Sequence, residues 1–231
     1  FLVSIDMATF EIIEKEGLKM VKATIQSESI RAEAGAMHYM LGDIELTTPM
    51  PSTKGFLKSL VTKESVFKPA YKGSGQIFFG PPIFGEYHEL ILEDEAWILD
   101  KGAYLCSDGS VEVGAFRNKA VSGLVGGEGL FQTKIQGTGK VLVQAPGKIE
   151  ILDLDNDKLT VDGSFAIARQ AHLDYSVQKA AKGILSSMAS GEGLVNVISG
   201  KGRVLLAPVP NLYNNLLSQM RSALPASTSG K

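Results

Sequence analysis

The chain has 231 residues, of which 44% are hydrophobic and 21% charged, with a formal net charge of −2 at pH 7. This composition supports a globular core of normal size and argues against a dedicated nucleic-acid-binding protein, which usually carries a basic surplus. The single cysteine, Cys106, excludes an intrachain disulfide and favours a cytoplasmic location, and no apolar stretch is long enough to predict a membrane span.

The first predicted elements are a strand, a glycine and a second strand over residues 30–39, IRAEAGAMHY. Met37 and Tyr39 have the two-residue spacing of a strand with one buried face. A segment with spaced apolar residues follows at 55–61, where we expect a short connecting helix. Residues 63–79, KESVFKPAYKGSGQIFF, then contain a Gly-x-Gly sequence, for which we predict a tight hairpin turn.

The same order of elements occurs twice more. Strand, glycine and strand are expected at 97–106 and at 159–167, where we match Phe165 and Ile167 with Met37 and Tyr39. Short connecting helices are expected at 120–126 and 183–189. The sequences GEGLFQTKIQGTGKVLV, from Gly127, and GEGLVNVISGKGRVLL, from Gly191, are the better preserved copies of the Gly-x-Gly segment.

These repeats predict an all-β protein made of three antiparallel β-sandwich or double-stranded β-helix units. Because one unit cannot bury its sheet alone, we expect a single domain, 1–231, with the units stacked about a pseudo-threefold axis. The units are about 10–80, 81–144 and 145–209. The apolar runs QIFF, KVLV and RVLL predict strands that are buried on both faces.

The last part of the chain has a different pattern. Residues 211–224, NLYNNLLSQMRSAL, carry apolar residues at helical spacing, with Asn211 as a candidate N-cap. This predicted helix packs either on its own sheet or on a neighbouring subunit. The small and polar residues 225–231 predict a disordered tail.

The glycines of GTGK, Gly137 to Lys140, invite comparison with a phosphate-binding loop. That motif requires glycine where Lys134 stands and serine or threonine where Val141 stands, and a helix should follow rather than a strand. A turn that recurs in three copies is also not what a single phosphate site needs. The sequence therefore argues against nucleotide binding here.

The candidate metal ligands and catalytic groups are few. The three histidines, His38, His88 and His172, form no His-x-His pair and occupy different places in their units, which argues against a cupin-type metal site or a catalytic triad. Cys106 lies in an apolar strand pattern, where a buried thiol is inert. We expect no catalytic residue, no metal site and no cofactor.

Glu64, Glu128 and Glu192 are the most suggestive polar set, because they are spaced at intervals of 64 residues. Threefold equivalence could bring them together as a ring of carboxylates that binds a cation or a backbone segment. The alternative, which we favour, is that each accepts backbone hydrogen bonds in the same local turn.

The doubled sequences GGEGLFQTKIQGTGKVLVQ and SGEGLVNVISGKGRVLLAP resemble a widespread family of uncharacterised bacterial proteins related to a mitochondrial biogenesis protein. The resemblance covers roughly residues 10–210. It implies a fold similar to that of the tryptophan RNA-binding attenuation protein (TRAP-like), with three units in the chain and further assembly into oligomers. A shared fold does not transfer function.

We expect a non-enzymatic, oligomeric binding or scaffold protein of unknown ligand, with a homotrimer as the favoured assembly. The alternative is a small-molecule- or RNA-binding protein that uses a site between repeats or subunits, although the dispersed basic residues make nucleic acid an unfavoured partner.

Overall fold

The computed structural model describes residues 8–48, 68–80, 85–118, 130–162, 165–179 and 194–208, together with Leu216 and Met220. The described segments form twelve strands, all paired antiparallel, which confirms the all-β class. The strands are β1 (Thr9–Lys15), β2 (Leu18–Ala32), β3 (Met37–Thr47), β4 (Ala70–Phe79), β5 (Glu86–Leu99), β6 (Tyr104–Asp108), β7 (Glu112–Asn118), β8 (Leu130–Ala145), β9 (Glu150–Asp162), β10 (Ala166–Gln170), β11 (Asp174–Lys179) and β12 (Leu194–Leu206).

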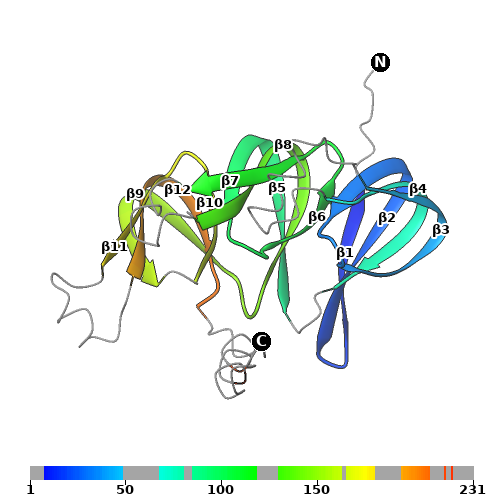
Figure 1. The fold of residues 1–231 in the computed structure, drawn as a ribbon, viewed down its shortest axis with the longest axis horizontal. Helices are drawn as coiled ribbons and strands as arrows, with labels where there is room; N and C mark the ends of the chain where they lie inside the picture. The colour runs from blue at the N-terminus through cyan, green and yellow to red at the C-terminus, as the bar shows by residue number, and fades with distance from the viewer. Residues whose placement is uncertain are drawn as a thin grey trace, which may run out of the picture.

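The strands fall into three consecutive groups, β1–β4, β5–β8 and β9–β12. The last strand of each group holds the group together: β4 pairs with β2 and β3, β8 with β5, β6 and β7, and β12 with β9, β10 and β11. The groups lie in a row along the long axis of the molecule, with the second in the middle (Figure 1).

Two strand pairings join neighbouring groups. We call the pairing of β2 with β6 the first joint and the pairing of β5 with β10 the second joint. The described strands of the first and third groups do not pair with each other. The expected stacking about a common axis is therefore not the arrangement of the described strands.

The Gly-x-Gly sequences lie inside strands, so the predicted hairpin turns are wrong. Gly73 and Gly75 are internal to β4, with φ angles of +139° and +153°. A Cβ atom on either would lie 2.1 Å from a carbonyl oxygen of β3, that of Asp43 or Leu41. Glycine is needed here because β3 and β4 approach too closely for a side chain.

The apolar runs after the Gly-x-Gly sequences are buried, as predicted. Ile77 and Phe79 in β4, Val141 and Val143 in β8, and Val204 and Leu205 in β12 are at most 1% exposed. Among the apolar residues of the three runs, only Leu206 is partly exposed. These strands supply the centre of each group because they are covered on both faces.

A β-bulge faces each Gly-x-Gly sequence. The bulged residues are Ser27 in β2, Asp94 in β5 and Asn156 in β9, and all three have left-handed backbones, with φ of 68°, 56° and 59°. A bulge of this kind bends its strand, here opposite the glycines of the partner strand. These bulges were not predicted from the sequence.

The predicted strand–glycine–strand order is confirmed for the first two groups, where Gly35 and Gly102 have φ of +80° in the connecting turns. Gly163 lies outside the described residues. The register shift that follows each turn lies between Met37 and Tyr39, between Tyr104 and Cys106, and between Ala166 and Ala168. Our match of Phe165 and Ile167 with Met37 and Tyr39 was therefore wrong by one residue.

The buried apolar residues form three clusters, and neighbouring groups share two of them. The cluster of the first group contains Leu105, Cys106 and Leu142 from the second. The cluster of the second group contains Ile167 and Leu205 from the third. Each of these cores is thus completed by the next group along the chain.

Several predicted segments lie outside the described residues. These are the connecting segments 55–61, 120–126 and 183–189, and the tail 225–231. Of the predicted helix 211–224, the structure describes only Leu216 and Met220, both exposed, so this helix stays a prediction. The described part of the chain contains no helix with the length and apolar character of a membrane span.

Candidate functional site

The predicted carboxylate set, Glu64, Glu128 and Glu192, lies outside the described residues, so neither its ring nor its turn interpretation is tested. The GTGK stretch is described and lies inside β8, which continues to Ala145 as a strand. A phosphate-binding loop would place a helix there, so the exclusion of that motif stands.

The three histidines have different surroundings. The His38 ring packs where a Cβ on Gly80 would be, 2.5 Å from the ring Cε1 atom. His88 is half-buried, and burial, followed by the charge of Arg203, lowers its pKa. His172 is exposed, with Nε2 2.9 Å from the carbonyl oxygen of Lys201. Across the described residues, no three His, Cys, Asp or Glu side chains are placed to hold a metal ion.

Cys106 is fully buried at the first joint, as the sequence predicted for an apolar strand. Burial raises the pKa of its thiol well above the ordinary value, and the charge of Asp108 adds to this effect. A thiol in this environment is protonated at neutral pH and is a poor nucleophile.

Polar side chains gather at the first joint. Lys68 contacts the carboxylate of Glu33 and lies 5.2 Å from the centre of the Tyr104 ring. The Tyr104 hydroxyl lies 2.9 Å from the hydroxyl of Ser107 and donates to the backbone carbonyl of Arg31 over 3.1 Å. Lys68, Glu33 and the hydroxyls of Tyr104 and Ser107 therefore all have partners.

The second joint carries a different polar cluster, which we call the Arg169 cluster: Asp100, Gln132, Arg169, Tyr175 and Asn196. The Gln132 side chain hydrogen-bonds Asp100. Burial raises the pKa of Asp100, and the charge of Arg169 offsets only part of this rise. The Tyr175 hydroxyl donates to Asn196 Oδ1 over 2.8 Å. The Arg169 guanidinium stacks on the Tyr175 ring, with its central carbon 4.3 Å from the ring centre.

Arg169 differs from the cation of the first joint because its charge is not directly paired. The residue is 6% exposed, and its buried Nε has no hydrogen-bond acceptor among the residues that the structure describes. No described carboxylate forms an ion pair with it within 4.0 Å, although Asp100 attracts it electrostatically. Burial lowers the pKa of this guanidinium. An unpaired buried donor on a cation is costly, so an anion at this position would be stabilised.

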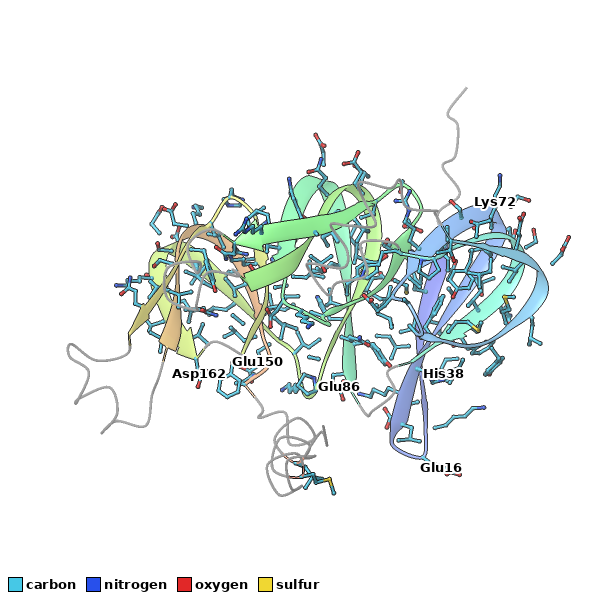
Figure 2. All side chains as sticks on the ribbon, in the orientation of Figure 1. Glu16, His38, Lys72, Glu86, Glu150 and Asp162 are labelled. Atoms are coloured by element: carbon cyan, nitrogen blue, oxygen red, sulfur yellow. The ribbon has the colours of Figure 1, made fainter. Side chains whose placement is uncertain are left out.

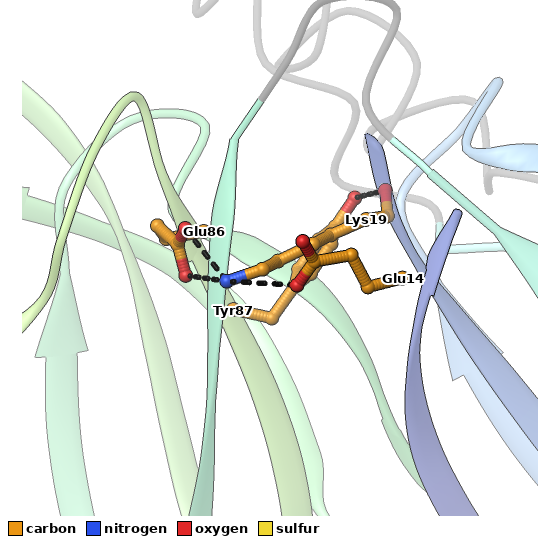
Figure 3. A network of polar contacts seen from close by, with 4 residues as sticks. All are labelled: Glu14, Lys19, Glu86 and Tyr87. Atoms are coloured by element: carbon orange, nitrogen blue, oxygen red, sulfur yellow. Dashed lines mark hydrogen bonds and ion pairs between the residues drawn. The ribbon is translucent and has the colours of Figure 1, made fainter. Parts of the chain in front are cut away.

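An ion network links the first and second groups on the surface. Lys19, from β2, lies 2.8 Å from both carboxylate oxygens of Glu86, which begins β5, and 3.8 Å from Glu14 of β1 (Figure 3). The hydrogen bond to Glu86 is the main reason that the pKa of Lys19 is raised. The Tyr87 hydroxyl donates to the Lys19 carbonyl over 3.4 Å.

Asp108, at the end of β6, connects three parts of the chain. One carboxylate oxygen accepts the backbone N–H of Ala8 over 3.1 Å, and the other accepts that of Lys140 over 2.7 Å. Burial raises the pKa of Asp108, while these two hydrogen bonds lower it. The carboxylate is structural, because both of its oxygens are used by backbone donors.

A shallow depression of about 420 Å³ lies on the third group, between β9, β10 and β12. Its lining residues are Asp153, Leu154, Asp155, Gln170, Lys201, Gly202 and Arg203. The charges are matched across strands, Arg203 with Asp153 at 2.8 Å and Lys201 with Asp155 at 2.9 Å. These pairs leave no unmatched charge in the depression to attract an ionic ligand.

Sequence reasoning did not predict the Arg169 cluster. Arg169 sits among apolar residues in the sequence FAIARQAHL, and its ring contact comes from Tyr175 in β11 of the same group. One signal was readable: Glu33, Asp100 and Asp162 each come shortly before the glycine of a strand–glycine–strand segment. The structure places Glu33 and Asp100 at the two joints, directly after β2 and β5.

The fold and these sites define an all-β protein of three joined strand groups, with polar clusters at the joints between groups. The chain belongs to the mitochondrial biogenesis AIM24 family, whose model matches residues 10–209. A curated relative, an uncharacterized protein of Streptococcus pyogenes serotype M6, is 28% identical over 189 residues, which cover 77% of this chain and 76% of the relative.

A solved crystal structure shares the fold. It is that of a Streptococcus pyogenes protein, which is 24% identical and superposes with a TM-score of 0.75. The match covers 94% of this chain and all of that chain. The likeness concerns the fold alone.

Proposed function

We propose that this protein is a non-enzymatic scaffold built from three copies of one strand unit, and that it acts as a homo-oligomer. Three features that recur at corresponding places support the repeat. The bulges at Ser27, Asp94 and Asn156 each face a Gly-x-Gly sequence. The likeness to the attenuation protein remains part of this proposal and concerns fold only.

The turn after each long strand is the second recurring feature. The backbone N–H donates to the carbonyl three residues earlier, from Ala36 to Glu33, from Ala103 to Asp100 and from Phe165 to Asp162, over 3.0–3.1 Å. A carboxylate-bearing residue therefore stands at the first position of all three turns. The same local chemistry at three places supports one unit used three times.

The observation that carries the proposal is the repetition of the joint itself. At the first joint Ala32 pairs with Cys106, and the Glu33 N–H donates to the Leu105 carbonyl over 2.7 Å. At the second joint Leu99 pairs with Ala168, and the Asp100 N–H donates to the Ile167 carbonyl over 2.8 Å. Units that join through one recurring interface form arrays that present surfaces.

The mass of the full chain in solution tests this proposal. Sedimentation velocity over a wide concentration range should give a discrete species larger than one chain, with a trimer favoured. A monomer at every concentration would contradict the homo-oligomer. If one of the three strand groups unfolded separately from the other two, this would argue against a single array.

A second candidate function is supported by Arg169. An unpaired, buried guanidinium between the second and third groups favours a small carboxylate or phosphate ligand bound between repeats. Inorganic phosphate and acetate, each tested at constant ionic strength, should raise the melting temperature of the wild type but not of Arg169→Met. Equal shifts in both proteins would reflect a general salt effect and reject this candidate.

A further inference from the structure

Two strand segments at opposite ends of the row have one unpaired edge. In the first group, Tyr39–Leu41 belong to β3, which pairs only with β4 among the described strands. In the third group, Leu159–Val161 belong to β9, which pairs only with β12 within the same part of the chain. Figure 2 labels His38 and Asp162, which adjoin these segments, toward opposite ends of the molecule.

The β3 segment exposes apolar side chains along this edge. Tyr39 is 45% exposed, Met40 36% and Leu41 58%. An exposed apolar edge strand is a template for pairing with another strand, and proteins usually cover or charge such edges. No charged residue interrupts these three positions.

The two segments correspond to the two halves of a joint. At the first joint Cys106–Asp108, which follow a register shift in β6, pair with Ile30–Ala32. Tyr39–Leu41 follow the matching register shift in β3. Leu159–Val161 begin three residues after the left-handed Asn156, just as Ile30–Ala32 begin three residues after Ser27.

The second joint obeys the same rule. Trp97–Leu99 begin three residues after the left-handed Asp94, and they pair with Ala168–Gln170, which follow the register shift in β10. Each joint thus pairs a segment that follows a bulge with a segment that follows a register shift. Two segments of each kind are paired within the chain, and one of each kind, Leu159–Val161 and Tyr39–Leu41, is left at its ends.

We propose that β3 of one copy pairs antiparallel with β9 of a second copy, so that copies join head to tail through a third joint of the same kind. The register places Tyr39 opposite Val161, Met40 opposite Thr160 and Leu41 opposite Leu159. The backbone N–H of Asp162 then donates to the carbonyl of His38 in the other copy. This inference rests on the proposed homo-oligomeric scaffold and specifies its interface.

The side chains that meet in this register are complementary. Leu41 faces Leu159 and Tyr39 faces Val161, so apolar surface that is exposed in one chain is buried between two. Such an interface joins two different surfaces, so it generates a closed ring or an open filament, depending on the rotation per copy. A closed ring of three copies would be the favoured trimer.

Cysteine pairs test the register. Tyr39→Cys and Val161→Cys, prepared as separate proteins and mixed, should give a disulfide-linked dimer on oxidation, because directly opposite residues bring their Cβ atoms to about 4.5–5.5 Å. Neither variant alone should crosslink, since the two surfaces differ. Native Cys106 is buried and does not compete. A mixture of Tyr39→Cys with Asp153→Cys, which lies elsewhere on β9, is the matched control and should stay uncrosslinked.

A surface substitution tests the contact independently. Leu41→Lys should reduce the oligomer to monomers, whereas Ile91→Lys, which replaces a 59% exposed apolar residue of the middle group, should not. If oligomers persist in Leu41→Lys and the cysteine mixture gives no disulfide, this interface is wrong while the homo-oligomeric scaffold stands. If the wild type is monomeric throughout, the proposed assembly itself fails. Crosslinking of either cysteine variant alone would instead indicate a symmetric contact and overturn the head-to-tail arrangement.

Discussion

The backbone N–H of Ser27 donates to the hydroxyl of Ser74 over 3.1 Å, across the paired strands β2 and β4. Ser27 is the bulged, left-handed residue, and Ser74 is the middle residue of a Gly-x-Gly sequence. The second group repeats this contact between Asp94 and Thr138 over 3.2 Å. In both groups, the side-chain hydroxyl thus accepts from a bulged residue whose backbone N–H has no partner in the strand pairing.

Ser74→Ala should therefore destabilise the protein by about 0.5–1 kcal/mol, the usual net contribution of one hydrogen bond that is partly open to solvent. Ser74→Thr is the matched variant, because threonine already fills this position in the second group. It should retain most of the stability. Urea unfolding at constant pH measures both, and equal losses in the two variants would show that the hydroxyl is not the cause.

Gly75→Ala should cost at least about 3 kcal/mol of stability or prevent folding, because it combines backbone strain with a backbone clash. The new Cβ would lie 2.1 Å from the Leu41 carbonyl oxygen, an atom that cannot move without separating β3 from β4. Gly114→Ala is the control, since its Cβ meets nothing within 4 Å. Thermal unfolding should leave this control almost unchanged; a similar loss in both would refute the close-approach argument.

Asp108→Ala should destabilise the fold by about 2–5 kcal/mol, because it leaves the backbone donors of Ala8 and Lys140 without their acceptor. Asp108→Asn keeps one acceptor oxygen and should lose less. Denaturant unfolding separates the two variants. If the asparagine variant were as unstable as the alanine variant, the negative charge rather than the hydrogen bonds would be the main contribution.

Lys19→Met should lower the urea midpoint slightly at low salt and leave it unchanged at high salt, since exposed ion pairs are weak and screened. Lys19 connects Glu14 and Glu86 across two groups. Lys72→Met, at an exposed lysine for which no ion pair is found among the described residues, is the control. A salt-independent loss in Lys19→Met alone would assign its effect to packing of the side-chain stem.

His88 predicts a pH dependence with a defined sign. Its pKa is lowered from 6.5 in the folded state, mainly by burial, so the unfolded chain binds the proton more tightly. The stability contribution is fully present above the unfolded pKa and is lost as the pH falls through the folded pKa. His88→Gln should therefore lose less stability than the wild type between pH 7.5 and pH 5. If the two proteins lost stability equally as the pH falls, the acid sensitivity would come from other titratable side chains.

Much of the strand content could be predicted from particular residues. The alternation around Met37 and Tyr39 and the apolar runs before Pro81 and Pro146 indicated strands, and the described parts of those strands are present. The Gly-x-Gly sequences were interpreted as turns because glycine favours turns in general. The structure shows that Gly73 and Gly75 serve the close approach of two strands, which depends on a partner strand that sequence spacing does not identify.

The polar clusters could be predicted less well. Asp100 stands before a turn glycine, and this placement was visible in three copies. Arg169 has no such signal, because Tyr175 lies in β11 and Asp100 directly follows β5 in another group. The carboxylate set Glu64, Glu128 and Glu192 lies outside the described residues and stays a prediction.

The sequence by itself determined the all-β class, the strand–glycine–strand segments of the first two groups and the burial of Cys106, because these follow from local spacing of apolar residues. Only the tertiary structure decided that the groups lie in a row and that the Nε of Arg169 is buried with no acceptor in the described part of the chain. It also revealed which edges of β3 and β9 have no partner among the described strands. The physical reason is that strand pairing and burial are set by contacts between residues far apart in the chain, which local periodicity does not encode.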